Sequence, residues 1–321
     1  MISKTESFLN LDPHMILECA EKHGFSPTGE LLQLNSYENR VFDIRLEPKD
    51  HQPASLIAKF YRPHRWSEST LLDEHNFEIE LKGEGLSVAV PYILKNNSTV
   101  DHHNGIYYSF FEKVRGRLLQ EISADDFKKI GRWIAQLHNI GETKKALSRA
   151  TLGPSTDQKW TLLEMMYPQV APEVREDYFD LAERIFQELD DRLKNVKNIR
   201  IHGDLHRGNI LESPEGFVVV DFDDFINGPS VQDIWMLMPD ENFLETSEFA
   251  SLVAGYQDLR HFPTEELSLI PYLRAYRMVC YAGWILNRWH DPSFPHLFPE
   301  FGTYRYWATQ TENLKKIAYG L

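Results

Sequence analysis

The feature of this 321-residue sequence that most constrains its fold is a change of texture near residue 115. Before that point, after a helix expected at 12–24, short β-forming segments follow one another with a single intervening amphipathic helix, 67–85. After it, most of the periodic segments have helical spacing. Strands followed by helices, rather than alternating with them, indicate an α+β fold. A chain of this length also exceeds one average domain, so we expect two lobes, residues 1–115 and 116–321.

Turn residues and hydrophobic periodicity place the individual elements. Besides the two helices named above, we expect two strands within 29–47 around the polar turn NSYEN, further strands at 55–62, 87–94 and 105–114, helices at 123–140 and 173–196, a buried strand, an acidic turn and a helix within 216–240, and a helical, aromatic-rich remainder from 243 to 317.

Charge and cysteine content exclude several classes of protein. The formal net charge is −14, which argues against nucleic-acid binding, because that requires basic surface; a cationic partner stays compatible with it. Cys19 and Cys280 are the only cysteines, too few for a disulfide framework or a metal cluster, so we expect a reducing compartment. Neither a signal peptide nor an apolar run of membrane-spanning length is found. The sequence therefore predicts a cytoplasmic monomer without membrane contact.

The stretch IRIHGDLHRGNIL, residues 199–211, places polar, turn-prone residues between two short apolar segments. Asp204 and Asn209 are five residues apart, and Asp221 follows at the end of the apolar run FVVV. A hairpin between the flanking strands would bring Asp221 beside Asn209. An amide and a carboxylate oxygen suit Mg²⁺, and Asp204 would stay free to accept the proton of a hydroxyl nucleophile.

Two other interpretations of these residues are open. His202 and His206 are four apart, a spacing that can bind zinc on a helix, but Gly203 and Gly208 disfavour a helix here and no third ligand is evident. The acidic residues Asp221, Asp223 and Asp224 could form a solvated turn. The apolar residues directly before them favour a buried strand whose end opens into a site.

The segment HGDLHRGN resembles the H-G-D-x-x-x-x-N loop of the kinase-like phosphotransferases, the superfamily of aminoglycoside phosphotransferases and choline kinases. The segments LNSYENRVF, KFYRPHRW, HGDLHRGNIL and NGPSVQDIWMLM are similar to the narrower bacterial stress response kinase A family of Ser/Thr protein kinases. The resemblance extends into the aromatic-rich segment 274–296 and so covers nearly the whole chain. It implies a bilobal protein-kinase-like fold with a small antiparallel-sheet N-lobe and a larger helical C-lobe.

The resemblance also implies which residues bind ATP. Lys59 would bind the α- and β-phosphates, held by a Glu of the next helix; the family pattern favours Glu74 and leaves Glu78 as the alternative. No G-x-G-x-x-G is present between the first two strands, so Ser36 in the turn would cover the phosphates, with autophosphorylation of Ser36 a weaker option. The connector after residue 111 would bind adenine through backbone groups of Glu112 and Val114.

Around the loop, the resemblance implies that Asp233 accepts backbone N–H groups of the catalytic loop, supported by His202, and that Asp221 and Asn209 bind Mg²⁺. The segment DFDD replaces D-F-G and no A-P-E follows, so the long activation loop is missing. The function implied is an ATP- and Mg²⁺-dependent Ser/Thr protein kinase that acts on protein substrates in the stress response. The alternatives are a small-molecule kinase, acting on an amino-alcohol or amino-sugar, and a pseudokinase that binds nucleotide or a partner without catalysis.

Overall fold

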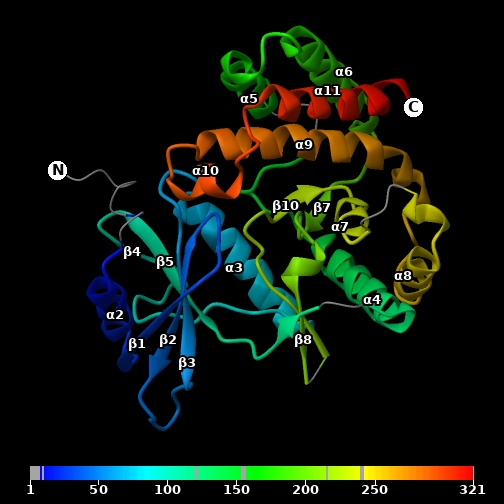
Figure 1. Ribbon diagram of the computed structural model, residues 1–321. Helices are drawn as coiled ribbons and strands as arrows, with labels where there is room; N and C mark the ends of the chain where they lie inside the picture. The colour runs from blue at the N-terminus through cyan, green and yellow to red at the C-terminus, as the bar shows by residue number, and fades with distance from the viewer. Residues whose placement is uncertain are drawn as a thin grey trace.

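A computed structural model of the chain describes residue 8 and residues 11–119, 122–152, 157–214, 216–238 and 242–320 (Figure 1). Its strand-rich part comprises α2 (Pro13–Lys22), β1 (Pro27–Leu34), β2 (Arg40–Leu46), β3 (Ser55–Phe60), α3 (Glu68–Gly83), β4 (Asp101–His103) and β5 (Ile106–Glu112). The helix-rich part comprises β6 (Arg117–Leu118), α4 (Ala124–Gly141), α5 (Asp157–Met166), α6 (Arg175–Leu193), β7 (Ile199–Ile201), β8 (Ile210–Ser213), β9 (Gly216–Val219), β10 (Ile226–Gly228), α7 (Gln232–Trp235), α8 (Ser247–Gln257), α9 (Ile270–Asn287), α10 (Ser293–Leu297) and α11 (Tyr304–Tyr319), with short 3₁₀ turns between some of them. The α+β prediction is confirmed.

The first part is an antiparallel sheet of five strands in the order β1-β2-β3-β5-β4. Lys59 lies in the central strand β3, opposite Val41 of β2 and Ser109 of β5. On one side of the sheet, α2 buries Ile16 and Ala20 against strand residues that share one hydrophobic cluster. Helix α3 lies between the sheet and the rest of the chain (Figure 1). Its first turn is fixed by the Ser67 side chain, which accepts a hydrogen bond from the N–H of Thr70.

The second part is built mainly of helices. Helices α4 and α8 pack closely together, and α9 packs against α5, α6 and α11, as Figure 1 shows for α9 lying beneath α6 and α11. There are two small antiparallel sheets, β7 with β10 and β6-β8-β9. In Figure 1, β7 and β10 lie beneath α9, and β8 lies lower, near the lower end of α3. The two small sheets carry the loop after β7 and the acidic turn after β9. Among the described residues, no helix has both the length and the apolarity needed to cross a membrane.

One of the expected elements, the strand at 87–94, is wrong. Residues 87–94 form no strand but only two isolated bridges, Val88 with Val219 and Pro91 with Phe111, because Pro91 has no N–H to donate to a ladder. The helix expected near the end of 216–240 is the short α7, and the strand β10 before it was not expected. Residues 239 and 240 of that segment lie outside the described residues.

Candidate active site

The hairpin between β8 and β9 brings the expected metal ligands together. Ile210 is paired with Val219 across it, and the N–H of Val220 donates to the carbonyl oxygen of Asn209 over 3.0 Å. Asp221 is therefore attached directly to a residue that is hydrogen-bonded to Asn209. The side-chain Nδ2 of Asn209 donates to the carbonyl oxygen of Asp204 over 3.0 Å. This hydrogen bond fixes the backbone of Asp204 relative to Asn209.

Two backbone positions in this region have left-handed conformations. Gly203 has φ of 84°, and a Cβ there would lie 2.2 Å from the carbonyl oxygen of Asp224, so only glycine allows the loop after β7 to approach the acidic turn this closely. Asp221 has φ of 65°, which is costly for a residue with a side chain and is typically found where function requires it. Its carboxylate is about half exposed, so it is accessible to a ligand.

The fully buried Asp233 binds the backbone of the loop after β7. One carboxylate oxygen accepts the N–H of His202 and the other the N–H of Gly203, both over 2.8 Å. His138 lies 3.4 Å from the same carboxylate and contacts the Tyr256 hydroxyl over 2.9 Å. These are the backbone contacts that the resemblance implied for Asp233.

His202 is fully buried, and both of its ring nitrogens contact the backbone. Nε2 lies 3.2 Å from the carbonyl oxygen of Val220, so it donates there, and Nδ1 accepts the N–H of Asp204 over 3.3 Å. His206 instead lies 3.6 Å from the Asp204 carboxylate. Since neither nitrogen of His202 is free, these histidines are not arranged as a zinc pair.

The Asp204 carboxylate contacts a cation that sequence reasoning missed. Nη1 of Arg277, on α9, lies 2.6 Å from Oδ1 of Asp204. Burial raises the pKa of Asp204 above its ordinary value, and Arg277 opposes that effect. Arg277 thus favours the ionised form, which a proton acceptor requires. Nothing in the sequence around Arg277 distinguishes it from other helical arginines.

Lys59 is buried among three carboxylates. Its Nζ lies 2.5 Å from Asp223, 3.2 Å from Asp221 and 3.9 Å from Glu74. Burial alone would lower the pKa of Lys59, but Asp223, Asp221 and Glu74 raise it well above its ordinary value. Lys59 is therefore a permanent cation beside the expected metal ligands. Asp223 had been interpreted only as part of an acidic turn, and its role as the nearest partner was not predicted.

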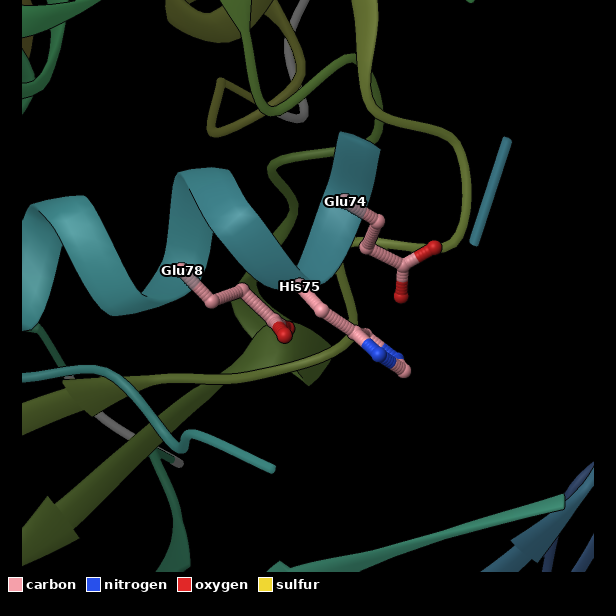
Figure 2. A group of neighbouring side chains, drawn as sticks. All are labelled: Glu74, His75 and Glu78. Atoms are coloured by element: carbon pink, nitrogen blue, oxygen red, sulfur yellow. The ribbon is translucent and has the colours of Figure 1, made fainter. Parts of the chain in front are cut away.

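Of the two candidate glutamates on α3, only Glu74 contacts Lys59. Figure 2 shows Glu74, His75 and Glu78 projecting from α3, with the two carboxylates on successive turns of the helix. Glu74 also forms an ion pair with Arg149. Burial and the nearby Asp223 raise the pKa of Glu74 to about 7. Burial, together with Glu74, raises the pKa of Glu78 well above its ordinary value.

These three side chains do not form a prepared metal site, although their ligand atoms lie within 4.8 Å of one another. Both nitrogens of His75 are occupied, Nε2 by the Tyr61 hydroxyl at 2.9 Å and Nδ1 by the Thr99 hydroxyl at 2.7 Å. The Glu74 carboxylate is shared between Lys59 and Arg149. The residues expected from the sequence to bind a metal ion, Asn209 and Asp221, lie on other segments, in the loop after β7 and the turn after β9.

The turn that holds Ser36, between β1 and β2, contacts the acidic segment. Ser36 Oγ accepts the N–H of Asn39 over 3.3 Å, and the Asn39 side chain donates to the Asp223 carboxylate. Glu38 lies 2.6 Å from Arg288 and accepts the indole N–H of Trp284 over 2.7 Å. The turn is therefore bonded on one side to Trp284 of α9 and to Arg288, which directly follows α9. On the other side it is bonded to Asp223, the nearest partner of Lys59.

The end of β5 and the connector after it contain the two residues expected to bind adenine, Glu112 and Val114, which differ in their backbone contacts. The N–H of Glu112 donates to Val90 over 3.3 Å, and the Lys113 side chain pairs with Asp43 at 2.6 Å. Within the described part of the chain, no hydrogen bond is made by the N–H of Val114. Of the two residues expected to bind adenine, Val114 therefore has its N–H available and Glu112 has only its carbonyl oxygen.

The sequence is similar to those of known phosphotransferases and kinases. A family described as phosphotransferase enzymes matches residues 30–270. Stress response kinase A of Escherichia coli strain K12 is 32% identical over 314 residues, which cover 95% of this chain and 92% of that protein. The serine/threonine protein kinase RdoA of Salmonella typhimurium strain LT2 is 32% identical over 320 residues, with the same coverage of both chains.

Solved structures show the same fold. The amicoumacin kinase hAmiN, in complex with AMP-PNP, Ca²⁺ and Ami, is similar with a TM-score of 0.78 and 20% identity, covering 99% of this chain and 96% of that one. The choline kinase LicA from Streptococcus pneumoniae is similar with a TM-score of 0.60 and 18% identity, covering 96% of this chain and all of that one. The protein-kinase-like fold class expected from the sequence is confirmed by this likeness.

Proposed function

Because the chain belongs to the phosphotransferase enzyme family and, within it, to the group of stress response kinase A, we propose that it is an ATP- and Mg²⁺-dependent kinase of serine and threonine hydroxyls on proteins. That it is a phosphotransferase follows from the family. The protein acceptor is proposed from the relative named a serine/threonine protein kinase, and a role in the stress response from the name of the others.

The observation that carries the proposal is the grouping of Asp204, Asn209 and Asp221. They lie on two neighbouring loops, joined by the hydrogen bonds from Asn209 Nδ2 to Asp204 and from Val220 to Asn209. Lys59 reaches the same loops from the other part of the chain, 3.2 Å from Asp221. Phosphoryl transfer needs these components: a proton acceptor for the hydroxyl, oxygen ligands for a cation, and a fixed positive charge for the phosphates.

In this mechanism Asp204 orients the acceptor hydroxyl and accepts its proton as the oxygen attacks phosphorus. Arg277, 2.6 Å away, keeps the carboxylate ionised before the attack. Lys59 binds the α- and β-phosphates, while Glu74 on α3 holds its ammonium group in position. The buried Asp233 fixes the backbone of the loop, so that Asp204 needs no rearrangement at the moment of transfer.

The residues present fit a magnesium ion. The Asn209 amide donates through Nδ2 to Asp204, and no donor in the described part of the chain contacts its Oδ1. Asp221 adds a half-exposed carboxylate. These are the hard oxygen ligands that Mg²⁺ prefers, with the remaining positions left to phosphate oxygens and water. When bound, the ion neutralises charge on the transferring phosphoryl group.

The remaining contacts to the nucleotide belong to the same proposal. Ser36 offers its N–H and hydroxyl to the phosphates from the turn held against Asp223 through Asn39. Adenine is bound at the connector, by the carbonyl oxygen of Glu112 and the N–H of Val114, where the two proposed lobes, residues 1–115 and 116–321, meet. A nucleotide-bound structure in which the Ser36 turn lies far from the phosphates would remove Ser36 from this role.

The adenine contacts predict that Val114→Pro weakens ATP binding more than Lys113→Ala does. Proline deletes the free N–H and fixes φ, whereas the lysine truncation removes only a surface ion pair with Asp43, worth about 0–1 kcal/mol. Isothermal titration calorimetry of both folded variants with ATP and Mg²⁺ measures the difference. Greater damage from Lys113→Ala would show that adenine is bound elsewhere.

The acceptor class is tested by incubating the protein with γ-labelled ATP and Mg²⁺ in three arms: alone, with a generic protein acceptor, and with a panel of small amino-alcohols and amino-sugars. We expect label on the protein acceptor and none without Mg²⁺. Label only on a small alcohol would replace the protein-kinase proposal by a small-molecule kinase. ATP binding without transfer in any arm would support a pseudokinase.

A further inference from the structure

A buried arginine outside the catalytic motif connects the two parts of the site that surround Lys59. Arg149 follows α4 and is only 5% exposed. It pairs with Glu74 of α3, and it also contacts the backbone of the acidic segment that holds Asp221 and Asp223. No feature of the local sequence marks it as functional.

All three nitrogens of the guanidinium donate hydrogen bonds. Towards α3, Nε donates to the carbonyl oxygen of Thr70 over 3.0 Å, and Nη2 donates to Oε2 of Glu74. Towards the acidic segment, Nη1 donates to the carbonyl oxygen of Asp223 over 2.6 Å and to that of Phe225 over 3.3 Å. The planar group also lies 4.5 Å from the centre of the Trp66 ring and 5.5 Å from that of Phe225.

These contacts fix α3 relative to the acidic segment. A guanidinium is rigid and donates in fixed directions, so its partners on both sides must keep their relative positions. The positions of all three carboxylates near Lys59 depend on these contacts of Arg149, because Glu74 lies on α3 and Asp221 and Asp223 lie on the acidic segment. A shift of either element would move Lys59 away from the phosphates or Asp221 away from the metal.

Charge gives a second reason for an arginine here. Glu74 is fully buried and lies near Asp223 and Glu78, and Lys59 is shared among three carboxylates. Arg149 is a second cation beside Glu74 and favours the ionised form of this carboxyl group. A buried carboxylate that loses its partner is strongly destabilised, so a neutral side chain at residue 149 would release Glu74 from its position beside Lys59.

We infer that Arg149 is a positioning residue that fixes Glu74 and the segment 221–225 relative to each other, and so holds Lys59 and Asp221 in the arrangement needed for phosphoryl transfer. The inference rests on the proposed function for its kinetic consequence. Its structural consequence, the coupling of α3 to the acidic segment, can be measured without any activity.

Arg200 offers a matched control. It is also 5% exposed, pairs with a glutamate of α3, Glu80, at 2.8 Å, and donates to the carbonyl oxygens of Ile140 and Gly141. It lies over the Phe77 ring at 4.4 Å. Removing it costs a comparable set of buried contacts, but none of them involves the acidic segment or a partner of Lys59.

The experiment compares the wild type with Arg149→Met, Arg149→Lys and Arg200→Met, each checked for folding by circular dichroism. Hydrogen–deuterium exchange of the nucleotide-free proteins should be faster at 68–78 and 221–225 in Arg149→Met and unchanged there in Arg200→Met. Steady-state kinetics should show kcat/KM for Mg²⁺-ATP reduced about 100-fold by Arg149→Met and close to wild type for Arg200→Met. Arg149→Lys, which keeps the charge but not the planar fork, should be intermediate.

Unchanged exchange at 68–78 and 221–225 in a folded Arg149→Met protein would overturn the inference. If Arg149→Met does not fold, the test relies on Arg149→Lys. Exchange and kcat/KM equal to those of the wild type in Arg149→Lys would also overturn the inference. A wild type that transfers no phosphoryl group to any acceptor would contradict the proposed function. The exchange measurement alone would then test whether Arg149 couples α3 to the acidic segment. Equal kinetic losses in Arg149→Met and Arg200→Met would reduce Arg149 to a residue of general stability.

Discussion

Replacing Asp204 by asparagine should reduce phosphoryl transfer by about 10²–10⁴-fold, the usual contribution of a positioned general base, while ATP binds as in the wild type. The carboxylate receives the proton of the acceptor and is expected to make no contact with the nucleotide. Asparagine has nearly the same shape, so the hydrogen bond from Asn209 to the backbone of residue 204 is kept. Measuring kcat and the dissociation constant of ATP separately distinguishes this result from a general disturbance of the site.

Asp258→Asn is the control for Asp204→Asn. Each of these aspartates lies 2.6 Å from an arginine, Arg277 for Asp204 and Arg132 for Asp258, but Asp258 lies at the end of α8 and is not part of the proposed site. It should leave kcat unchanged. Undiminished turnover in Asp204→Asn would remove Asp204 from the role of base.

Replacing Asp221 by alanine should weaken Mg²⁺-dependent ATP binding by at least about 10-fold, since even the loss of an outer-shell partner of a metal ligand costs 10–100-fold in metal affinity. It should lower turnover as well. Lys59 keeps Asp223 at 2.5 Å, so the loss should appear in the metal-dependent part of binding. Calorimetry with ATP, in the presence and absence of Mg²⁺, measures that part directly.

Asp224→Asn is the control for Asp221→Ala. It removes a half-exposed carboxylate from the same segment, one that pairs with Arg65 at 2.6 Å and lies outside the proposed metal site. Mg²⁺ should strengthen ATP binding to this variant as it does for the wild type. An equal gain from Mg²⁺ in Asp221→Ala would contradict the assignment of Asp221 as a ligand.

The parts of the site that could be predicted are those that local sequence determines. A tight hairpin between two short apolar strands leaves few ways to place Asn209 and Asp221, and the structure joins them through Val220. Helical spacing, in contrast, puts Glu74 and Glu78 on the same face of α3, so spacing alone could not decide between them and only the family pattern favoured Glu74. The choice depends on how α3 packs, and that is fixed partly by Arg149, which is 75 residues from Glu74.

The residues that were missed act over long separations in the chain. Asp223 becomes the nearest partner of Lys59 only because the acidic turn packs against β3, and Arg277 reaches Asp204 from a helix near the C-terminus. Segment 87–94 has strand-forming residues on both sides of Pro91, but no neighbouring strand pairs with it along its length. For Asp223 and Arg277, tertiary packing rather than local preference determined the outcome.

The most direct test of the proposed phosphoryl transfer is phosphoamino-acid analysis of a protein acceptor after incubation with γ-labelled ATP and Mg²⁺. The wild type should yield phosphoserine or phosphothreonine, and Asp204→Asn should yield neither above background in the same time. A wild type that leaves the label on ATP, or places it only on small-molecule hydroxyls, would contradict the protein-kinase proposal, and equal labelling by both proteins would contradict the mechanism through Asp204.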